Sequence, residues 1–292
     1  MTIFVDLTGR IGNQMFQYAF ARKIQEKLGT EIVLNDSFLN EKSNFHNELN
    51  CFKLNKCVKT SNAKLPYWVY RHNPINRVLT KHCGNLQRKI KEKSNSLYWY
   101  GDTYEPYKIS NDKDIYISGY YQSEKYFEGI QENLKKEFFP RSSISETASQ
   151  FLELIKKSPN SVCITVRRGN YITNPKYKEK YYVANEDYFK KAIFEIKKRV
   201  SNPTIFIFSD DLEWARENAW QLDNGYVEPS GLELEEKMLI MSCCNHFIIS
   251  NSTFSWWAQF LSSNSEKIVI SPKNWYADGR KTDIYQPNWI KI

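Results

Sequence analysis

Short apolar runs, each followed by a polar loop and then by a helical segment, recur through the second half of the chain. Strands that alternate with helices in this way pair in parallel, because each return to the same edge of a sheet needs a crossover. The second half is therefore predicted to be a doubly wound α/β sheet. Its strands and helices are expected at 162–166, 186–199, 204–208, 212–220, 233–243, 246–249, from Phe254 onward, and at 267–270.

The first half shows the same pattern clearly only at its two ends. Apolar residues recur at strand and then at helical spacing near the N-terminus. Residues 36–100 give few clean periodicities, and about two helices are expected among them. The clear elements are strands at 3–7, 31–35 and 115–119 and helices at 15–28 and 124–137.

The length of 292 residues suits two α/β domains better than one core. A polar stretch at 141–145, just after Pro140, can open a new helix. We therefore predict an N-terminal domain over 1–145 and a C-terminal domain over 146–292.

The composition narrows the class of partner. The net charge of +8 favours an anionic ligand or an anionic membrane surface. Nucleic acid is disfavoured as a partner, because the basic residues are spread along the chain instead of forming one patch interleaved with aromatic residues.

The sequence also indicates a compartment. The N-terminal residues enter a strand directly, without the basic and apolar regions of a signal peptide. The apolar runs are far shorter than the ~20 residues that span a bilayer. The six cysteines form no CxxC pair, so we expect reduced, mostly buried thiols. A cytoplasmic protein is predicted, with peripheral contact at the cytoplasmic face of the inner membrane as its form of membrane association.

Polar residues follow three of the predicted strands in the second half. In open α/β sheets, ligands bind outside the carboxyl ends of the strands. The polar groups at these ends are Arg167 with Arg168, Ser209 with Asp210 and Asp211, and Asn251 with Ser252 and Thr253. The topology therefore predicts one ligand site formed by all three groups.

Each group could contribute to binding a ligand that carries phosphate. An arginine can bind phosphate through two N–H groups and stays charged at any relevant pH. Because successive residues point apart, we expect one arginine to face the ligand and the other a structural carboxylate. We expect Asp210 to bind ligand and Asp211 to cap the next helix. The hydroxyl-rich loop before Phe254 would hold phosphate at a helix N-terminus, unless it is only an N-cap.

A second turn of interest lies between the first strand and the first helix. Gly12 and Asn13 stand where backbone N–H groups could meet an anion. The alternative is a simple βα turn capped by Asn13. An Asp-x-Asp match at Asp112 and Asp114 sits in a polar loop, where a solvated turn is favoured over a metal site.

Together, in their order, these motifs resemble the α-1,2-fucosyltransferase family of bacterial surface-polysaccharide synthesis and of eukaryotes. The resemblance spans roughly residues 3–275. The matching blocks are 9–21, 119–127, 166–169, 208–211 and 250–257, of which the first and last are the most diagnostic.

The resemblance implies a GT-B-like fold, with two Rossmann-like domains and the ligand cleft between them. It implies an inverting transfer of L-fucose from GDP-fucose to a galactoside hydroxyl of a bacterial surface glycan, in α-1,2 linkage, without metal or other cofactor. The N-terminal domain would take the acceptor and the C-terminal domain the donor. Arg167 and Asn13 would be catalytic, and the donor would contact Gly12, Thr165, Arg168, Ser209, Asp210, Asn251, Ser252 and Thr253.

Two positions depart from the family's pattern His-x-Arg-Arg-x-Asp, since Thr165 replaces the histidine and Asn170 the aspartate. An amide cannot act as a general base. The base is therefore another group, with Asp6 as a candidate, or the step needs little base assistance. The alternatives that stay open are the same fold with another sugar nucleotide or acceptor, and a sugar-nucleotide-binding protein without catalysis.

Overall fold

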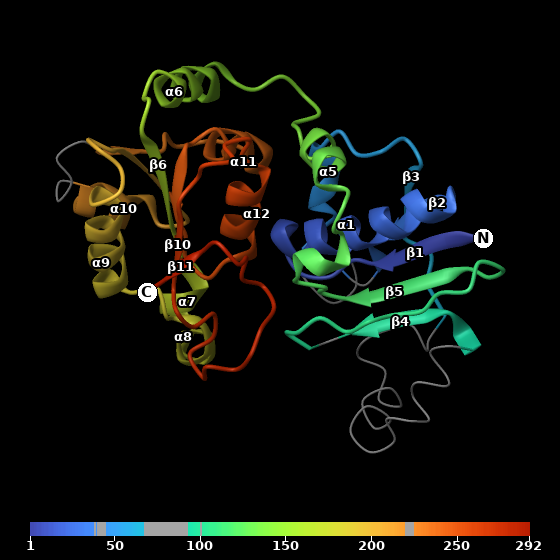
Figure 1. The fold of residues 1–292 in the computed structure, drawn as a ribbon. Helices are drawn as coiled ribbons and strands as arrows, with labels where there is room; N and C mark the ends of the chain where they lie inside the picture. Colours follow the sequence, from blue (N-terminus) through green and yellow to red (C-terminus); the bar gives the residue numbers. More distant parts are fainter. Residues whose placement is uncertain (38, 40–44, 67–92, 100, 220–224) are drawn as a thin grey trace. The chain divides into compact units, whose positions relative to one another are not determined.

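The computed structural model describes residues 1–37, 39, 45–66, 93–99, 101–219 and 225–292, and the chain divides into two compact units, Met1–Phe138 and Phe139–Ile292 (Figure 1). The division falls a few residues before the predicted boundary at 145. The reason is that Ser145 already bonds within the second unit, since its backbone N–H donates to Glu236 at 2.6 Å.

The N-terminal unit is built on a parallel sheet with the strand order β3-β2-β1-β5-β4. The helix α1 packs across β1, β2 and β5. The strands are β1 (Thr2–Asp6), β2 (Glu31–Asn35), β3 (Val58–Ser61), β4 (Ser96–Trp99) and β5 (Ile115–Gly119), and the helices are α1 (Ile11–Leu28), α5 (Gln131–Glu137) and the 3-10 turns η1 (Glu48–Cys51) and η3 (Glu124–Tyr126).

The single helix predicted at 124–137 is wrong. The chain forms η3 and then α5, with a break between them. At the break Gly129 has φ +89°, a left-handed conformation that glycine adopts without steric cost. About two helices were predicted somewhere within 36–100. The described residues of this range instead include the strands β3 and β4 and the turn η1, and residues 67–92 lie outside the described part of the chain.

The C-terminal unit has a second parallel sheet, ordered β11-β10-β9-β6-β7-β8. Its strands are β6 (Ser161–Val166), β7 (Thr204–Ser209), β8 (Gly225–Val227), β9 (His246–Ile248), β10 (Val269–Ser271) and β11 (Ile290–Lys291). Its helices are α6 (Glu146–Lys156), α7 (Gly169–Thr173), α8 (Pro175–Tyr181), α9 (Glu186–Lys197), α10 (Leu212–Ala219), α11 (Leu234–Ser242) and α12 (Thr253–Leu261).

This second sheet is covered on both faces, which explains why its strands are apolar throughout. Alternate residues of β6 and β7, such as Ile164 and Ile207, share one core cluster with residues of α9 and α10. On the other face, Phe151 of α6 packs edge-on against Phe206 and Phe208. Figure 1 shows α9 and α10 on one side of the sheet and α11 and α12 on the other.

The predicted thiols are free, but fewer of them are buried than expected. Of the five described cysteines, Cys163 and Cys244 are buried, whereas Cys51 and Cys57 are partly exposed and Cys243 is exposed. Cys83 lies outside the described residues.

Candidate functional site

The three polar groups predicted to meet do meet, at the carboxyl edge of the C-terminal sheet. The central strand β6 pairs with β7 on one side and with β9 on the other, in parallel. The register places Val166 beside Ser209 and Ile164 beside Ile248. The residues that follow these three strands therefore leave the sheet at one place.

Both arginines after β6 pair with the two carboxylates after β7. Nη1 of Arg167 lies 2.9 Å from Oδ2 of Asp210, and Nε of Arg168 lies 3.0 Å from Oδ2 of Asp211. Arg168 thus faces a structural carboxylate, as expected for one of the two arginines, and Arg167 pairs with a carboxylate as well; that Arg167 faces the ligand stays a prediction. The side chains of Arg167 and Asp210 keep 26% and 25% of their surface exposed, so the pair can be reached from solvent.

The backbone of the turn after β6 also approaches Asp210 closely. The backbone N–H of Arg168 donates to Oδ1 of Asp210 at 2.8 Å. A Cβ placed on Gly169 would lie 2.3 Å from Oδ2 of the same carboxylate. A side chain at position 169 would therefore displace the Asp210 carboxylate from this contact.

The Asp211 carboxylate caps α10, as the sequence predicted. Its Oδ1 accepts a hydrogen bond from the backbone N–H of Trp214 at 3.1 Å. The other oxygen holds Arg168, whose guanidinium also lies over the Trp214 ring at 4.4 Å. Asp211 and Arg168 therefore fix each other at the start of the helix.

A buried carboxylate that the sequence analysis missed supports this turn from β8. The backbone N–H of Ser209 donates to Oε1 of Glu228 at 2.8 Å. Oε2 of Glu228 lies 3.0 Å from Nζ of Lys237, an ion pair by distance without hydrogen-bond alignment. Burial raises the pKa of Glu228, and Lys237 opposes that shift. No sequence motif marks Glu228, because β8 has only three residues.

The loop after β9 presents a helix N-terminus. Ser252 is the N-cap residue of α12, yet its side chain makes no capping hydrogen bond. Ser252 and Thr253 are both partly exposed. The interpretation of this loop as only an N-cap is therefore wrong, and its hydroxyls and the helix N-terminus are accessible to an anion.

Two predicted donor-binding residues lie beneath this loop instead of on it. Thr165 is 5% exposed, and its hydroxyl accepts from the backbone N–H of Ser250 at 3.2 Å. Asn251 is 2% exposed, and its amide N–H groups donate to the carbonyls of Tyr181 and Trp275. Their contacts with a donor stay predictions. Asn170, at the family's aspartate position, is exposed.

In the N-terminal unit, the turn between β1 and α1 differs from the prediction. The helix α1 begins at Ile11 with Arg10 as N-cap, so Asn13 lies in the first turn and caps nothing. Oδ1 of Asn13 accepts a hydrogen bond from Gln122 at 2.9 Å, and Gly12 is buried. The roles predicted for Gly12 and Asn13 stay predictions.

Two buried glutamines of the block 9–21 hold the start of α1 in place, and neither was predicted to do so from the sequence. The amide of Gln14 donates to the carbonyls of Gly9 and His46, each at 2.9 Å. The amide of Gln17 donates to the Thr8 hydroxyl at 2.9 Å and to the Gly119 carbonyl at 2.8 Å. These bonds tie α1 to the loops at the sheet's carboxyl edge.

The candidate base Asp6 lies at the carboxyl end of β1 and is 1% exposed. Its Oδ2 accepts from the Ser118 hydroxyl at 2.9 Å, and its Oδ1 has no hydrogen-bond partner in the described part of the chain. Burial raises the pKa of Asp6 to about 7. Such a carboxyl can hold a proton near neutral pH, but in this structure it does not reach the surface.

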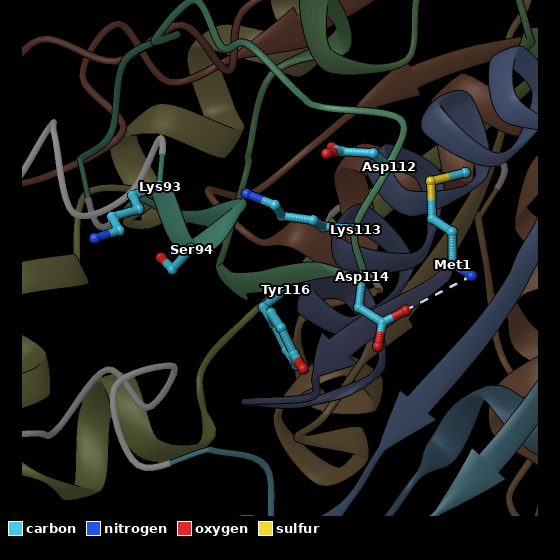
Figure 2. A pocket seen from close by; sticks show the side chains of 7 residues that line it. All are labelled: Met1, Lys93, Ser94, Asp112, Lys113, Asp114 and Tyr116. Atoms are coloured by element: carbon cyan, nitrogen blue, oxygen red, sulfur yellow. Dashed lines mark ion pairs between the residues drawn. The ribbon is translucent and has the colours of Figure 1, made fainter.

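The residues of the Asp-x-Asp match lie at the opposite, amino-terminal edge of that sheet. Asp114 accepts from the backbone N–H of Thr2 at 2.8 Å and pairs with the amino group of Met1 at 3.9 Å. Asp112, Asp114 and Met1 line a hollow of about 430 Å³ together with Lys93 and Tyr116. Figure 2 shows these side chains. Among the described residues, no three His, Cys, Asp or Glu side chains are grouped to hold a metal.

The family profile described as Glycosyl transferase family 11 matches residues 2–292 of this chain. The chain belongs to this family. It is therefore a glycosyltransferase, as the resemblance predicted. In the described helices we find no segment that is long and apolar enough to cross a membrane.

Two curated relatives match the chain almost from end to end. The O-antigen biosynthesis glycosyltransferase WbnK of Escherichia coli is 32% identical over 307 aligned positions, covering 98% of this chain and 99% of the relative. An α-1,2-colitosyltransferase of Escherichia coli is 26% identical over 304 positions, covering 98% and 97%.

Among solved structures, the fucosyltransferase NodZ from Bradyrhizobium aligns with a TM-score of 0.53 at 13% identity, over 89% of this chain and 93% of that chain. Identity this low shows the fold alone. The predicted α/β class with two Rossmann-like domains of GT-B type is confirmed.

Proposed function

We propose that this glycosyltransferase transfers L-fucose from GDP-fucose to the 2-hydroxyl of a galactoside in a bacterial surface glycan, with inversion at the anomeric carbon. The observation that carries the proposal is the exposed Arg167–Asp210 pair beside the open N-terminus of α12. Family membership and the O-antigen biosynthesis enzyme among the relatives support a glycan acceptor.

In this mechanism the donor diphosphate lies on the C-terminal unit, and the N-terminal unit recognises the acceptor. As the bond between C1 and the phosphate oxygen breaks, negative charge develops on GDP. Arg167, Arg168 and the helix N-terminus at Ser252 and Thr253 stabilise that charge, in place of a metal ion. Groups already in position when the charge develops need little reorganisation during the reaction.

The acceptor oxygen forms its bond to C1 on the opposite face, and its proton leaves to water or to the departing diphosphate. Neither residue at the family's His and Asp positions serves as a base, since Thr165 is buried in a hydrogen bond and Asn170 carries an amide. A transition state with oxocarbenium character at C1 needs little base assistance, which is consistent with these two substitutions.

A second candidate donor is GDP-colitose, because one relative is an α-1,2-colitosyltransferase. Colitose is L-fucose without its 3-hydroxyl. A site that hydrogen-bonds a substrate hydroxyl can reject the analogue that lacks it by on the order of 10⁴. The ratio of kcat/KM for the two donors therefore separates the two functions.

The experiment measures binding and slow hydrolysis of GDP-fucose, GDP-colitose, GDP-mannose, UDP-galactose and dTDP-rhamnose, each with and without EDTA. We expect micromolar binding of GDP-fucose and release of fucose that EDTA does not change. No binding of any GDP-sugar, or strict dependence on a metal, would contradict the proposal. Tight binding without turnover on any acceptor would identify a non-catalytic binding protein.

The acceptor is tested with a β-galactoside and its 2-deoxy analogue as the matched control. Transfer to the first and none to the second is the expected result, with the linkage read from the NMR spectrum of the product. Equal transfer to both would show that another hydroxyl is used.

A further inference from the structure

The aromatic side chain of Tyr171 lies at the centre of the candidate donor site, although no motif singles it out. Tyr171 belongs to α7, the short helix that follows the two arginines. Its ring faces the guanidinium of Arg167, which lies 5.5 Å from the ring centroid. Its hydroxyl donates a hydrogen bond to the backbone carbonyl of Asn251 at 3.3 Å. One residue thus contacts both the arginine and the loop that precedes α12.

Neighbouring aromatic rings also hold Tyr171 in place. The ring of Tyr181 lies parallel to it, with centroids 5.3 Å apart and planes inclined by 16°. The ring of Tyr276 follows at 5.8 Å from Tyr181. The amide of Asn251 donates to the carbonyl of Tyr181 at 2.8 Å, so the same loop is hydrogen-bonded to both Tyr171 and Tyr181. Tyr171 is therefore fixed independently of Arg167.

The contacts of Arg167 explain what such a ring contributes. In the described part of the chain, Arg167 makes one ion pair, from Nη1 to Asp210, and one ring contact, with Tyr171. A guanidinium has five N–H donors. The ring face attracts the cation without accepting any of them in a hydrogen bond. Asp210 and Tyr171 together orient the guanidinium and leave most of its donors free for phosphate oxygens.

We propose that Tyr171 is a positioning residue. It holds the Arg167 side chain at a fixed position relative to the Asn251–Thr253 loop, so that the arginine and the loop can bind the donor diphosphate together. This inference rests on the proposed function, because it needs a diphosphate-bearing donor. Burial raises the pKa of the Tyr171 phenol to about 12, which keeps the hydroxyl protonated and able to donate to Asn251.

The test compares the dissociation constants of GDP and guanosine for four variants: Tyr171→Leu, Tyr171→Phe, Arg167→Ala and the double variant Tyr171→Leu with Arg167→Ala. Only GDP carries the diphosphate. We expect Tyr171→Leu to weaken GDP binding on the order of 10-fold and to leave guanosine binding unchanged. Tyr171→Phe keeps the ring and loses one hydrogen bond, so about a 3-fold effect on GDP is expected.

The double variant decides whether Tyr171 acts through Arg167. Once Arg167 is alanine, we expect Tyr171→Leu to weaken GDP binding by no more than about 3-fold, the part that belongs to the lost hydrogen bond with Asn251. Full additivity of the two losses would overturn the inference, as would equal weakening of GDP and guanosine by Tyr171→Leu. Thermal unfolding of each variant, together with the Tyr171→Phe result, separates a positioning effect from general destabilisation.

The matched control is Tyr177→Leu. Tyr177 also contacts Tyr181, at 5.7 Å between ring centroids, but it is 45% exposed and is not the ring that faces Arg167. Its replacement should leave the affinities for GDP and guanosine unchanged. If the wild type binds another nucleoside diphosphate instead of GDP, the proposed donor is wrong, and the same comparison is made with that diphosphate and its nucleoside. Binding of no nucleoside diphosphate would overturn both proposals.

Discussion

The carboxyl edges of the two sheets carry polar residues of very different kinds. In the N-terminal unit, Asn35, Asp6 and Ser118 stand side by side on β2, β1 and β5, and each is at most 1% exposed. In the C-terminal unit, the paired side chains of Arg167 and Asp210 are about one quarter exposed.

This difference separates polar groups that hold the fold from polar groups that are available for chemistry. Buried polar groups contribute when they are hydrogen-bonded and cost free energy when they are not. The block at 9–21 is one of the two most diagnostic parts of the resemblance, yet its glutamines bond to backbone and neighbouring side chains. A diagnostic motif is therefore not necessarily a reactive one, and the two edges should respond differently to substitution.

The largest effect is expected for Arg167→Ala. The variant removes the guanidinium that we propose stabilises the departing diphosphate. The transfer rate should therefore fall by on the order of 10²–10³, by analogy with the loss of one transition-state donor. Because Arg167 is partly exposed, the midpoint of urea unfolding should change little. The measurement is kcat for GDP-fucose hydrolysis and transfer.

The matched control for Arg167 is Arg199→Ala. Arg199 follows the C-terminal end of α9 and pairs with Glu195 of that helix at 2.6 Å. It should leave the rate unchanged. Near-normal turnover of Arg167→Ala would remove Arg167 from the role that we give it.

The second prediction concerns the opposite edge and Gln17→Ala. Gln17 is fully buried and makes hydrogen bonds to Thr8 and Gly119, which lose their partner in the variant. We expect the free energy of unfolding to fall by about 2–4 kcal/mol. The donor affinity of the molecules that remain folded should stay the same, because we propose the donor site on the other unit. Urea unfolding and GDP titration measure the two quantities.

An exposed glutamine gives the control for Gln17. Gln150→Ala on α6 loses a surface contact with Glu146 and should cost under about 0.5 kcal/mol. Equal costs for the two substitutions would break the distinction between the two edges.

The third prediction uses the pH dependence of Asp6→Asn. The pKa of Asp6 is raised by burial from 3.8 to about 7. A raised folded pKa means that the neutral carboxyl stabilises the fold below pH 4 and that this contribution is lost as the pH rises through 7. Between pH 5 and pH 8 the wild type should lose about 2 kcal/mol relative to Asp6→Asn, which cannot ionise. Urea unfolding at each pH gives the difference.

The two stability curves should converge near pH 4, where Asp6 is neutral in the folded protein. Parallel curves across the whole range would show that Asp6 titrates alike in the folded and unfolded states. A large loss of turnover in Asp6→Asn, without a change in stability, would instead restore Asp6 as a candidate base.

Four of the six described strands of the C-terminal sheet could be predicted closely from the sequence, whereas β8, β11 and the connections between the strands could not. The apolar run at 162–166 differs from β6 by one residue, because a strand buried on both faces must be apolar throughout. The helices α7 and α8 were not predicted, since they have no fully buried residue and hence no apolar stripe at helical spacing. Yet α7 carries Tyr171.

The candidate site, like the fold, could be predicted only in part. Its location was predictable, because parallel topology brings the residues after β6, β7 and β9 to one edge whatever their side chains do. The individual partners were not. Glu228 follows a strand of three residues, and Gln14 and Gln17 have the composition of an exposed helix face, although tertiary contacts bury them. Burial of a polar side chain depends on what packs against it, which local sequence does not record.

The smallest effect is expected at Asp211, which makes both a capping hydrogen bond with Trp214 and an ion pair with Arg168. Asp211→Asn keeps an oxygen that can accept from the Trp214 N–H and loses the ion pair with Arg168. Its cost should be at most about 0.5 kcal/mol, because a pair that is partly exposed is screened by solvent. Asp211→Ala loses the cap as well and should cost about 1 kcal/mol. If the two variants were equally destabilised, the ion pair and not the cap would hold the turn, and the charged groups at this edge would be structural like the buried groups of the N-terminal sheet.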